Sequence, residues 1–74
     1  MSNGQPWEYG ILEWIWDQGE IRITLPYAEE VFHSGSYAEV ARALTELGRQ
    51  GWEVATNSGT ANWLLWTLRR AVRY

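Results

Sequence analysis

The sequence predicts a single small α+β domain, in which one helix packs on one face of a four-stranded, mainly antiparallel sheet in the order ββαββ. Three observations lead to this prediction. The chain has 74 residues, which is room for one hydrophobic core. Its middle shows the apolar spacing of an amphipathic helix, and the stretches on either side show the spacing of strands. Turns containing glycine separate these stretches, so we expect a flexible lead-in over residues 1–6 and one domain over residues 7–74.

The first two strands are predicted to form a hairpin. Aromatic and β-branched residues run through residues 7–17, and residues 21–25 alternate at a period of two until Pro26 ends them. Gln18 and Gly19 between them predict a two-residue turn, which sets the register of the hairpin. The predicted pairs are Asp17 with Glu20, Trp16 with Ile21, Trp14 with Ile23, and Leu12 with Leu25. One face of the hairpin is then apolar, and the helix should cover that face.

Residues 27–34 (YAEEVFHS) have no strong period, and we interpret them as a loop that could include a turn of helix or a short strand extension. A helix over residues 37–49 follows, with Ser36 as its N-cap and Glu39 completing a capping box. Gly51 lies where a left-handed residue would end this helix. The stripe expected to be buried comprises Tyr37, Val40, Ala41, Leu44 and Leu47.

Two further strands are predicted after the helix. Residues 52–56 alternate, residues 57–60 (NSGT) form a turn cluster, and residues 62–70 form the last strand. The side chains that can point toward the helix are Leu12, Trp14, Trp16, Ile21, Ile23, Leu25, Trp52, Val54, Leu64, Trp66 and Leu68. This is already a generous core for one helix of 13 residues to cover.

Two strings carry a resemblance to a known family: the opening Trp7-Glu8-Tyr9 and the helix exit LTELGRQGWEV over residues 44–54. They resemble the small bacterial family called domain of unknown function 4177. Members of that family open with a Trp-Glu-Tyr strand, leave the helix through Leu-Asn-Glu-Leu-Gly-x-Glu-Gly-Trp-Glu, and end in a short apolar strand followed by basic residues. Residues 18–34 depart from the family pattern by a longer second strand and loop. The resemblance implies the fold and brings no activity, cofactor or catalytic residue.

Composition and charge argue against several classes of protein. There is no cysteine, which removes disulfides, thiolate metal ligands and cysteine nucleophiles. The net charge of −3 is opposite in sign to that of a protein held to a phosphate backbone. The start of the chain lacks the basic and apolar segments of a signal peptide, and no apolar run approaches 18 residues. We therefore expect a soluble cytoplasmic protein without a membrane span.

Two groups of residues could carry chemistry. The single histidine, His33, follows Glu29 and Glu30 at helical spacing, which would suit a metal site or an acid–base pair. Two ligand positions do not complete a metal site, and no nucleophile elbow or phosphate-binding glycine pattern occurs, so we predict no metal, no cofactor and no enzymatic activity. Near the end of the chain, Arg69, Arg70 and Arg73 are candidates for binding a ligand or an anion. Their plainer role is to keep a sheet edge soluble.

A surplus of apolar residues remains after the core has been assigned. The six that would lie on the face away from the helix are Trp7, Tyr9, Ile11, Ile15, Trp63 and Leu65. Monomers rarely expose so many large apolar groups in one patch, and Trp and Tyr often anchor interfaces. These six residues are therefore the predicted binding interface. The alternative is that a bulge turns Trp7 and Tyr9 into the core, or that residues 27–34 cover them.

The predicted function is a non-enzymatic interaction module, a homo-oligomeric adaptor or regulator that binds itself or another protein through this aromatic face. One alternative is a sensor of a small ligand or nucleotide, with an aromatic and arginine-lined pocket at a subunit boundary. A weaker alternative is a binder of single-stranded nucleic acid through the C-terminal arginines, which the acidity of the chain makes unlikely.

Overall fold

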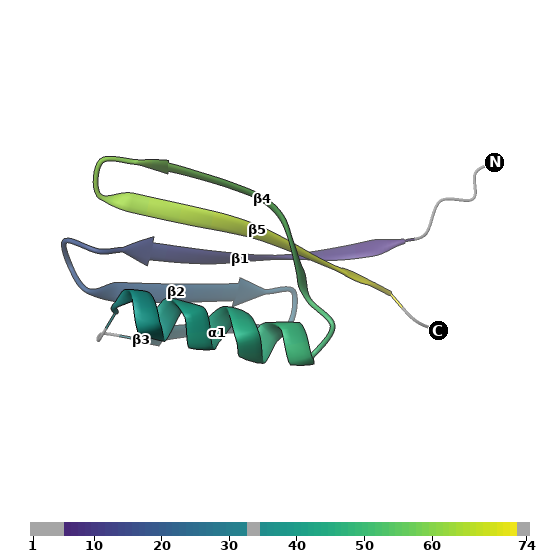
Figure 1. Cartoon of the computed structure of the whole chain (residues 1–74). Coiled ribbons are helices and arrows are strands. Elements are labelled where there is room, and N and C mark those ends of the chain that lie inside the picture. Colours follow the sequence, from purple (N-terminus) through teal and green to yellow (C-terminus); the bar gives the residue numbers. More distant parts are fainter. Residues whose placement is uncertain (1–5, 33–34, 73–74) are drawn as a thin grey trace.

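A computed structural model describes residues 6–32 and 35–72, and in this part of the chain five antiparallel strands form one sheet with a helix across one side (Figure 1). The elements are β1 (Trp7–Ile15), β2 (Glu20–Leu25), β3 (Ala28–Phe32), α1 (Tyr37–Arg49), β4 (Glu53–Thr60) and β5 (Trp63–Ala71). Their order across the sheet is β3-β2-β1-β5-β4, so β1 is the central strand and β3 and β4 are the two edges. The predicted α+β class and antiparallel sheet are confirmed.

The predicted four strands and ββαββ order are wrong, because β3 forms within the stretch that we interpreted as a loop. Pro26 and Tyr27 turn the chain, and β3 then pairs with β2 from Ala28 opposite Leu25 to Phe32 opposite Ile21. All five residues of β3 are exposed. An alternating pattern arises when one face of a strand is buried, and this edge strand has no such face to mark it in the sequence.

The hairpin of β1 and β2 has a longer turn than predicted. Residues 16–19 form the turn, with Gly19 at φ +63°, and Trp14 lies opposite Ile21 rather than Ile23. The predicted register is therefore wrong by two residues. Because side chains alternate between the faces with a period of two, an even shift leaves each strand residue on its expected face. Trp16 itself leaves the strand and lies in the turn.

The predicted turn cluster over residues 57–60 belongs to β4, and the chain turns later, at residues 61–62. Gly59 has a packing role in this strand. A Cβ atom there would overlap the Leu64 side chain and lie 2.9 Å from the Trp63 carbonyl oxygen on β5. Ala55 is an extra residue between Val54, opposite Leu68, and Thr56, opposite Thr67, so β4 carries a bulge near its start.

Both ends of α1 follow from local chemistry, and the predicted bounds are confirmed. At the start, the Ser36 hydroxyl oxygen accepts a hydrogen bond from the Glu39 backbone N–H at 3.3 Å. At the end, Gly51 has φ +96°, and its N–H donates to the Gly48 carbonyl at 3.0 Å. The N–H of Trp52 donates to the Leu47 carbonyl at 3.1 Å, which completes a Schellman motif.

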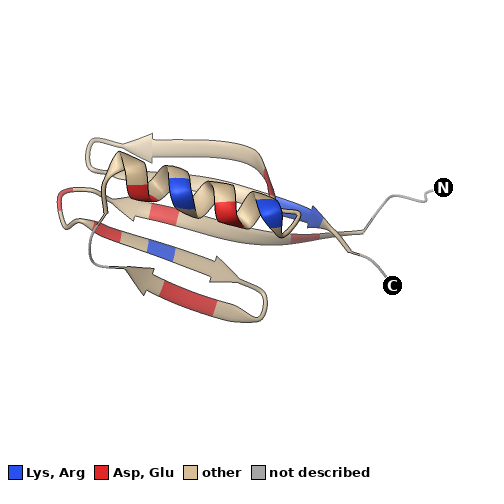
Figure 2. Ribbon diagram, turned by 60° about the horizontal axis from the view of Figure 1, so that its bottom comes forward, with Lys and Arg blue, Asp and Glu red and all other residues tan. Residues whose placement is uncertain are grey.

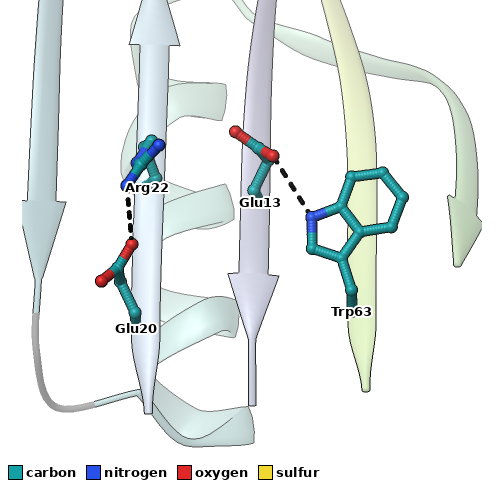
Figure 3. Close-up of polar contacts among 4 residues, drawn as sticks. All are labelled: Glu13, Glu20, Arg22 and Trp63. Atoms are coloured by element: carbon teal, nitrogen blue, oxygen red, sulfur yellow. Dashed lines mark hydrogen bonds and ion pairs between the residues drawn. The ribbon is translucent and has the colours of Figure 1, made fainter. Parts of the chain in front are cut away.

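The core lies between α1 and the middle of the sheet. Its buried residues are Leu12, Trp14, Ile21, Ile23, Val40, Leu47, Trp52 and Leu68, with Leu25, Ala43, Leu44, Leu64 and Trp66 packed against them. Trp16 and Val54, which we expected in this core, are 48% and 50% exposed. A helix is about 10 Å across and strands are about 4.8 Å apart, so α1 covers about two strands. Figure 3 shows it behind β1 and β2, and the edge strand β4, which carries Val54, lies beyond it.

Candidate interaction surface

The side of the sheet away from α1, here called the open face, brings together the six residues predicted as an interface. On β1, Leu12 and Trp14 point into the core, so the alternate residues point to the open face. On β5, Leu68 points into the core, which places the odd-numbered residues of that strand on the open face. The six residues are Trp7, Tyr9, Ile11 and Ile15 on β1, and Trp63 and Leu65 on β5.

Neither of the two alternatives for these residues is found in the part of the chain that the structure describes. β1 pairs with β5 residue for residue, from Trp7 opposite Ala71 to Ile15 opposite Trp63, so Trp7 and Tyr9 are not turned into the core by a bulge. Residues 28–32 lie beside β2 as an edge strand instead of covering the open face. Tyr9 remains 56% exposed, and Trp7 and Ile11 are exposed as well.

A row of polar groups crosses the open face and fixes the tryptophan at the start of β5 (Figure 3). The indole Nε1 of Trp63 donates to Glu13 Oε2 at 3.2 Å across the β1–β5 pair. On β2, Arg22 donates to Glu20 at 2.9 Å. Glu13 lies on β1 between Arg22 on β2 and Leu65 on β5. These two neighbours limit the conformations of its side chain. Trp63 is thus held in one orientation before any partner arrives, which lowers the entropy cost of binding.

A second aromatic side chain of the open face is held by an arginine. The guanidinium of Arg69 lies over the Trp7 ring, 4.3 Å from its centroid. Its Nε donates to Glu53 Oε1 on β4 at 2.7 Å. Arg69 therefore links an aromatic residue on β1 to a carboxylate on β4, and its charge is matched within the chain.

The next arginine, Arg70, lies on the opposite side of the sheet. It donates to Glu8 Oε2 at 2.9 Å and to the Gln50 carbonyl at 3.0 Å, and its guanidinium is 4.6 Å from the centroid of the Trp52 ring. The hydrogen bond to Glu8 raises the pKa of the Arg70 guanidinium above its ordinary value. These contacts tie the end of α1 to the outer ends of β1 and β5.

The three arginines proposed as ligand or anion candidates do not form one cluster in the described residues. Arg69 and Arg70 are neighbours in a strand and point to opposite faces, each paired with a carboxylate. Arg73 lies outside the described residues. Trp63 and Trp66, two aromatic residues of the same strand, also point to opposite faces. The basic and aromatic groups that base stacking would need are thereby separated.

The acidic residues near His33 do not converge either. Glu29 is opposite Thr24 and Glu30 is opposite Ile23, so the two carboxylates leave β3 on opposite sides. His33 lies outside the described residues. Among the described residues, no group of three or more His, Asp or Glu side chains is placed to hold a metal ion.

A hollow of about 620 Å³ lies beside α1, with Ile21, Phe32 and Ala43 among its lining residues. Its volume is within the range that small ligands fill. Its rim is charged, but the charges are already paired along the helix, Glu39 with Arg42 and Glu46 with Arg49. The charged side chains around this hollow therefore pair with one another and do not converge on a point where a ligand could bind.

Comparisons of the chain with protein-family models, with curated proteins and with solved structures found no match. The resemblance to domain of unknown function 4177 thus stays a prediction, and the function is argued from the geometry. Within the described residues, no helix combines the length and the apolarity needed to cross a membrane.

The structure also shows exposed aromatic residues that the sequence reasoning missed. Trp16 and Tyr37 flank the buried Trp14, with ring centroids 6.3 Å and 4.7 Å from its centroid, and Tyr37 is 79% exposed. We had assigned both to the core. Trp16 lies in the turn after β1 and Tyr37 is the first residue of α1, so both lie at the end of the core, and a longer turn than predicted is the feature that places Trp16 there.

Proposed function

We propose that the chain is a non-enzymatic interaction module, an adaptor that self-associates by placing its open face against the open face of a second copy. The observation that carries the proposal is the row of apolar and aromatic side chains along β1 and β5, which no described element of the chain covers. Trp63 and Trp7 in this row are held in place by Glu13 and Arg69. Trp7 is exposed and Trp63 is partly buried, and aromatic side chains held in place at a surface are typical of the centres of protein interfaces.

The size of the open face suits one partner of similar size. Five strands about 4.8 Å apart, of five to nine residues each at about 3.4 Å per residue, give a face of roughly 600 Å² in plan. A standard interface buries about 800 Å² of accessible surface on each partner, and the relief of the side chains brings the open face close to that value. The whole face can therefore be occupied by a second copy.

Four charged side chains of the open face are paired within the chain. Glu20 and Arg22 pair with each other on the β2 side, and Glu53 and Arg69 pair on the β4 side. The apolar strip lies between these two pairs, with the hydrogen-bonded Glu13 inside it, and Glu29 adds a carboxylate on β3. An apolar centre with a polar rim is the usual composition of a protein interface.

The test is a double substitution, Tyr9→Glu with Trp63→Arg, which charges the open face and spares the fold. The new glutamate would lie opposite Arg69 and the new arginine beside Glu13, so each charge has a partner within its own chain. The net charge is unchanged. We expect the mass measured by light scattering to fall relative to the unsubstituted protein, with the circular dichroism spectrum preserved.

Tyr37→Glu is the matched control, because Tyr37 is a highly exposed aromatic residue on the helix side of the molecule. This variant should keep the mass of the unsubstituted protein. If the double variant also keeps that mass while remaining folded, the open face is not the interface and the proposal is wrong.

A further inference from the structure

The two edges of the sheet differ in how they resist pairing with another strand. An edge strand presents unpaired N–H and C=O groups, and proteins protect such edges with short strands, charges, prolines or bulges. β3 has five residues, two of them glutamate, and it follows Pro26 closely. β4 has eight residues, all exposed, and beyond Glu53 at its start it carries no charge and no proline (Figure 2). Its bulge at Ala55 is confined to the start of the strand, so residues 56–60 carry none of these protections and form the less protected edge.

We propose that β4 is a second interface, which pairs antiparallel with β4 of a second copy about a two-fold axis perpendicular to the sheet. The pairing joins two sheets edge to edge, with both helices on the same side. It uses backbone groups of β4 and leaves the apolar strip of the open face free. It therefore stands apart from the function proposed above.

The bulge in β4 selects the register of this pairing. Ala55 interrupts the ladder, so the regular part of β4 is the five-residue stretch over residues 56–60. Residues that pair across the axis must share a face of the sheet, and the register that uses all five residues is centred on Ser58. It places Ser58 opposite Ser58, Thr56 opposite Thr60, and Asn57 opposite Gly59. The pairs are uncharged, and Thr–Thr pairs across antiparallel strands are stabilising.

The same operation applied to β3 gives an unfavourable result. Centring its five residues on the axis would place Glu30 opposite Glu30 of the second copy. Like charges directly opposite each other destabilise a strand pair. This contrast between the edges identifies β4 as the self-pairing edge and a second copy as its occupant.

The test uses opposite charges at the centre of the predicted register. Ser58→Asp and Ser58→Lys are each introduced into the Tyr9→Glu/Trp63→Arg background, in which the open face is blocked. That background should form a dimer through β4, and each Ser58 variant alone should have the monomer mass of 8.6 kDa. Mixing the two variants in equal amounts places Asp opposite Lys, and the mixture should recover the dimer mass.

Val31→Asp and Val31→Lys are the matched controls, because Val31 is an exposed residue of the opposite edge strand. In the same background both should keep the dimer mass, alone and mixed. Recovery of the dimer by the Ser58 mixture also shows that each variant is folded. The β4 interface is overturned if the background is already monomeric, if either Ser58 variant alone stays dimeric, or if the mixture stays monomeric. If the open-face proposal is wrong instead, the Tyr9→Glu/Trp63→Arg variant keeps the mass of the unsubstituted protein.

Discussion

Gly48 and Gly51 lie three residues apart at the end of α1, and a methyl group has opposite consequences at the two positions. Gly51 has φ +96°, a conformation that an L residue adopts only with strain, and its Cβ would lie 3.2 Å from the Arg70 side chain. Gly48 is helical, and nothing lies within 4 Å of the position its Cβ would take. Glycine is therefore needed at one position and merely tolerated at the other.

We predict that Gly51→Ala lowers the free energy of unfolding by about 1–2 kcal/mol, because it forces alanine into the left-handed region. Gly48→Ala should raise it by about 0.5–1 kcal/mol through the higher helix propensity of alanine. Urea denaturation followed by circular dichroism measures both values. Changes of the same sign in the two variants would show that the helix does not end in the motif described here.

The residue scale also shows which parts of the candidate site the sequence could predict. The six residues of the open face were predicted because alternation alone decides the face, and the two-residue error in register did not alter it. The same alternation separates Arg69 from Arg70, which we had grouped. Arg69 and Arg70 are adjacent in sequence, and adjacency in a strand places side chains on opposite faces.

At the scale of elements, α1 was predictable and β3 was not. The ends of α1 depend on nearby residues, the cap at Ser36 and the left-handed Gly51, so a short stretch of sequence contains the information. β3 is defined by its pairing with β2, and its exposed residues carry no alternation. β4 shows the same dependence, because pairing with β5 extends it through residues typical of turns.

The narrow cover provided by α1 leads to a prediction about two aliphatic residues. Leu12 lies on the central strand under the helix and is fully buried, whereas Val54 lies on β4 beyond the helix and is half exposed. Leu12→Ala should lower the free energy of unfolding by about 2–5 kcal/mol. Val54→Ala should lower it by less than about 1 kcal/mol. Comparable losses in urea denaturation would mean that the helix side of β4 is covered after all.

At the scale of the whole molecule, the chain is a thin two-layer domain whose sheet is wider than its helix. A domain near this length buries only about 60% of the surface that its unfolded chain exposes, so added burial through association stabilises it substantially. The two proposed interfaces have two-fold axes that can be perpendicular, the open-face axis within the plane of the sheet and the β4 axis normal to it. Such axes are compatible with a closed tetramer of two stacked sheets.

The most direct test of the central claim, self-association through the open face, is the absolute mass of the unsubstituted protein in solution. It would be measured by light scattering coupled to gel filtration over a dilution series, beside the Tyr9→Glu/Trp63→Arg variant. We predict a mass that is a multiple of the monomer mass of 8.6 kDa for the unsubstituted protein, and a smaller mass for the variant. A mass of 8.6 kDa for the unsubstituted protein at every concentration would contradict the account.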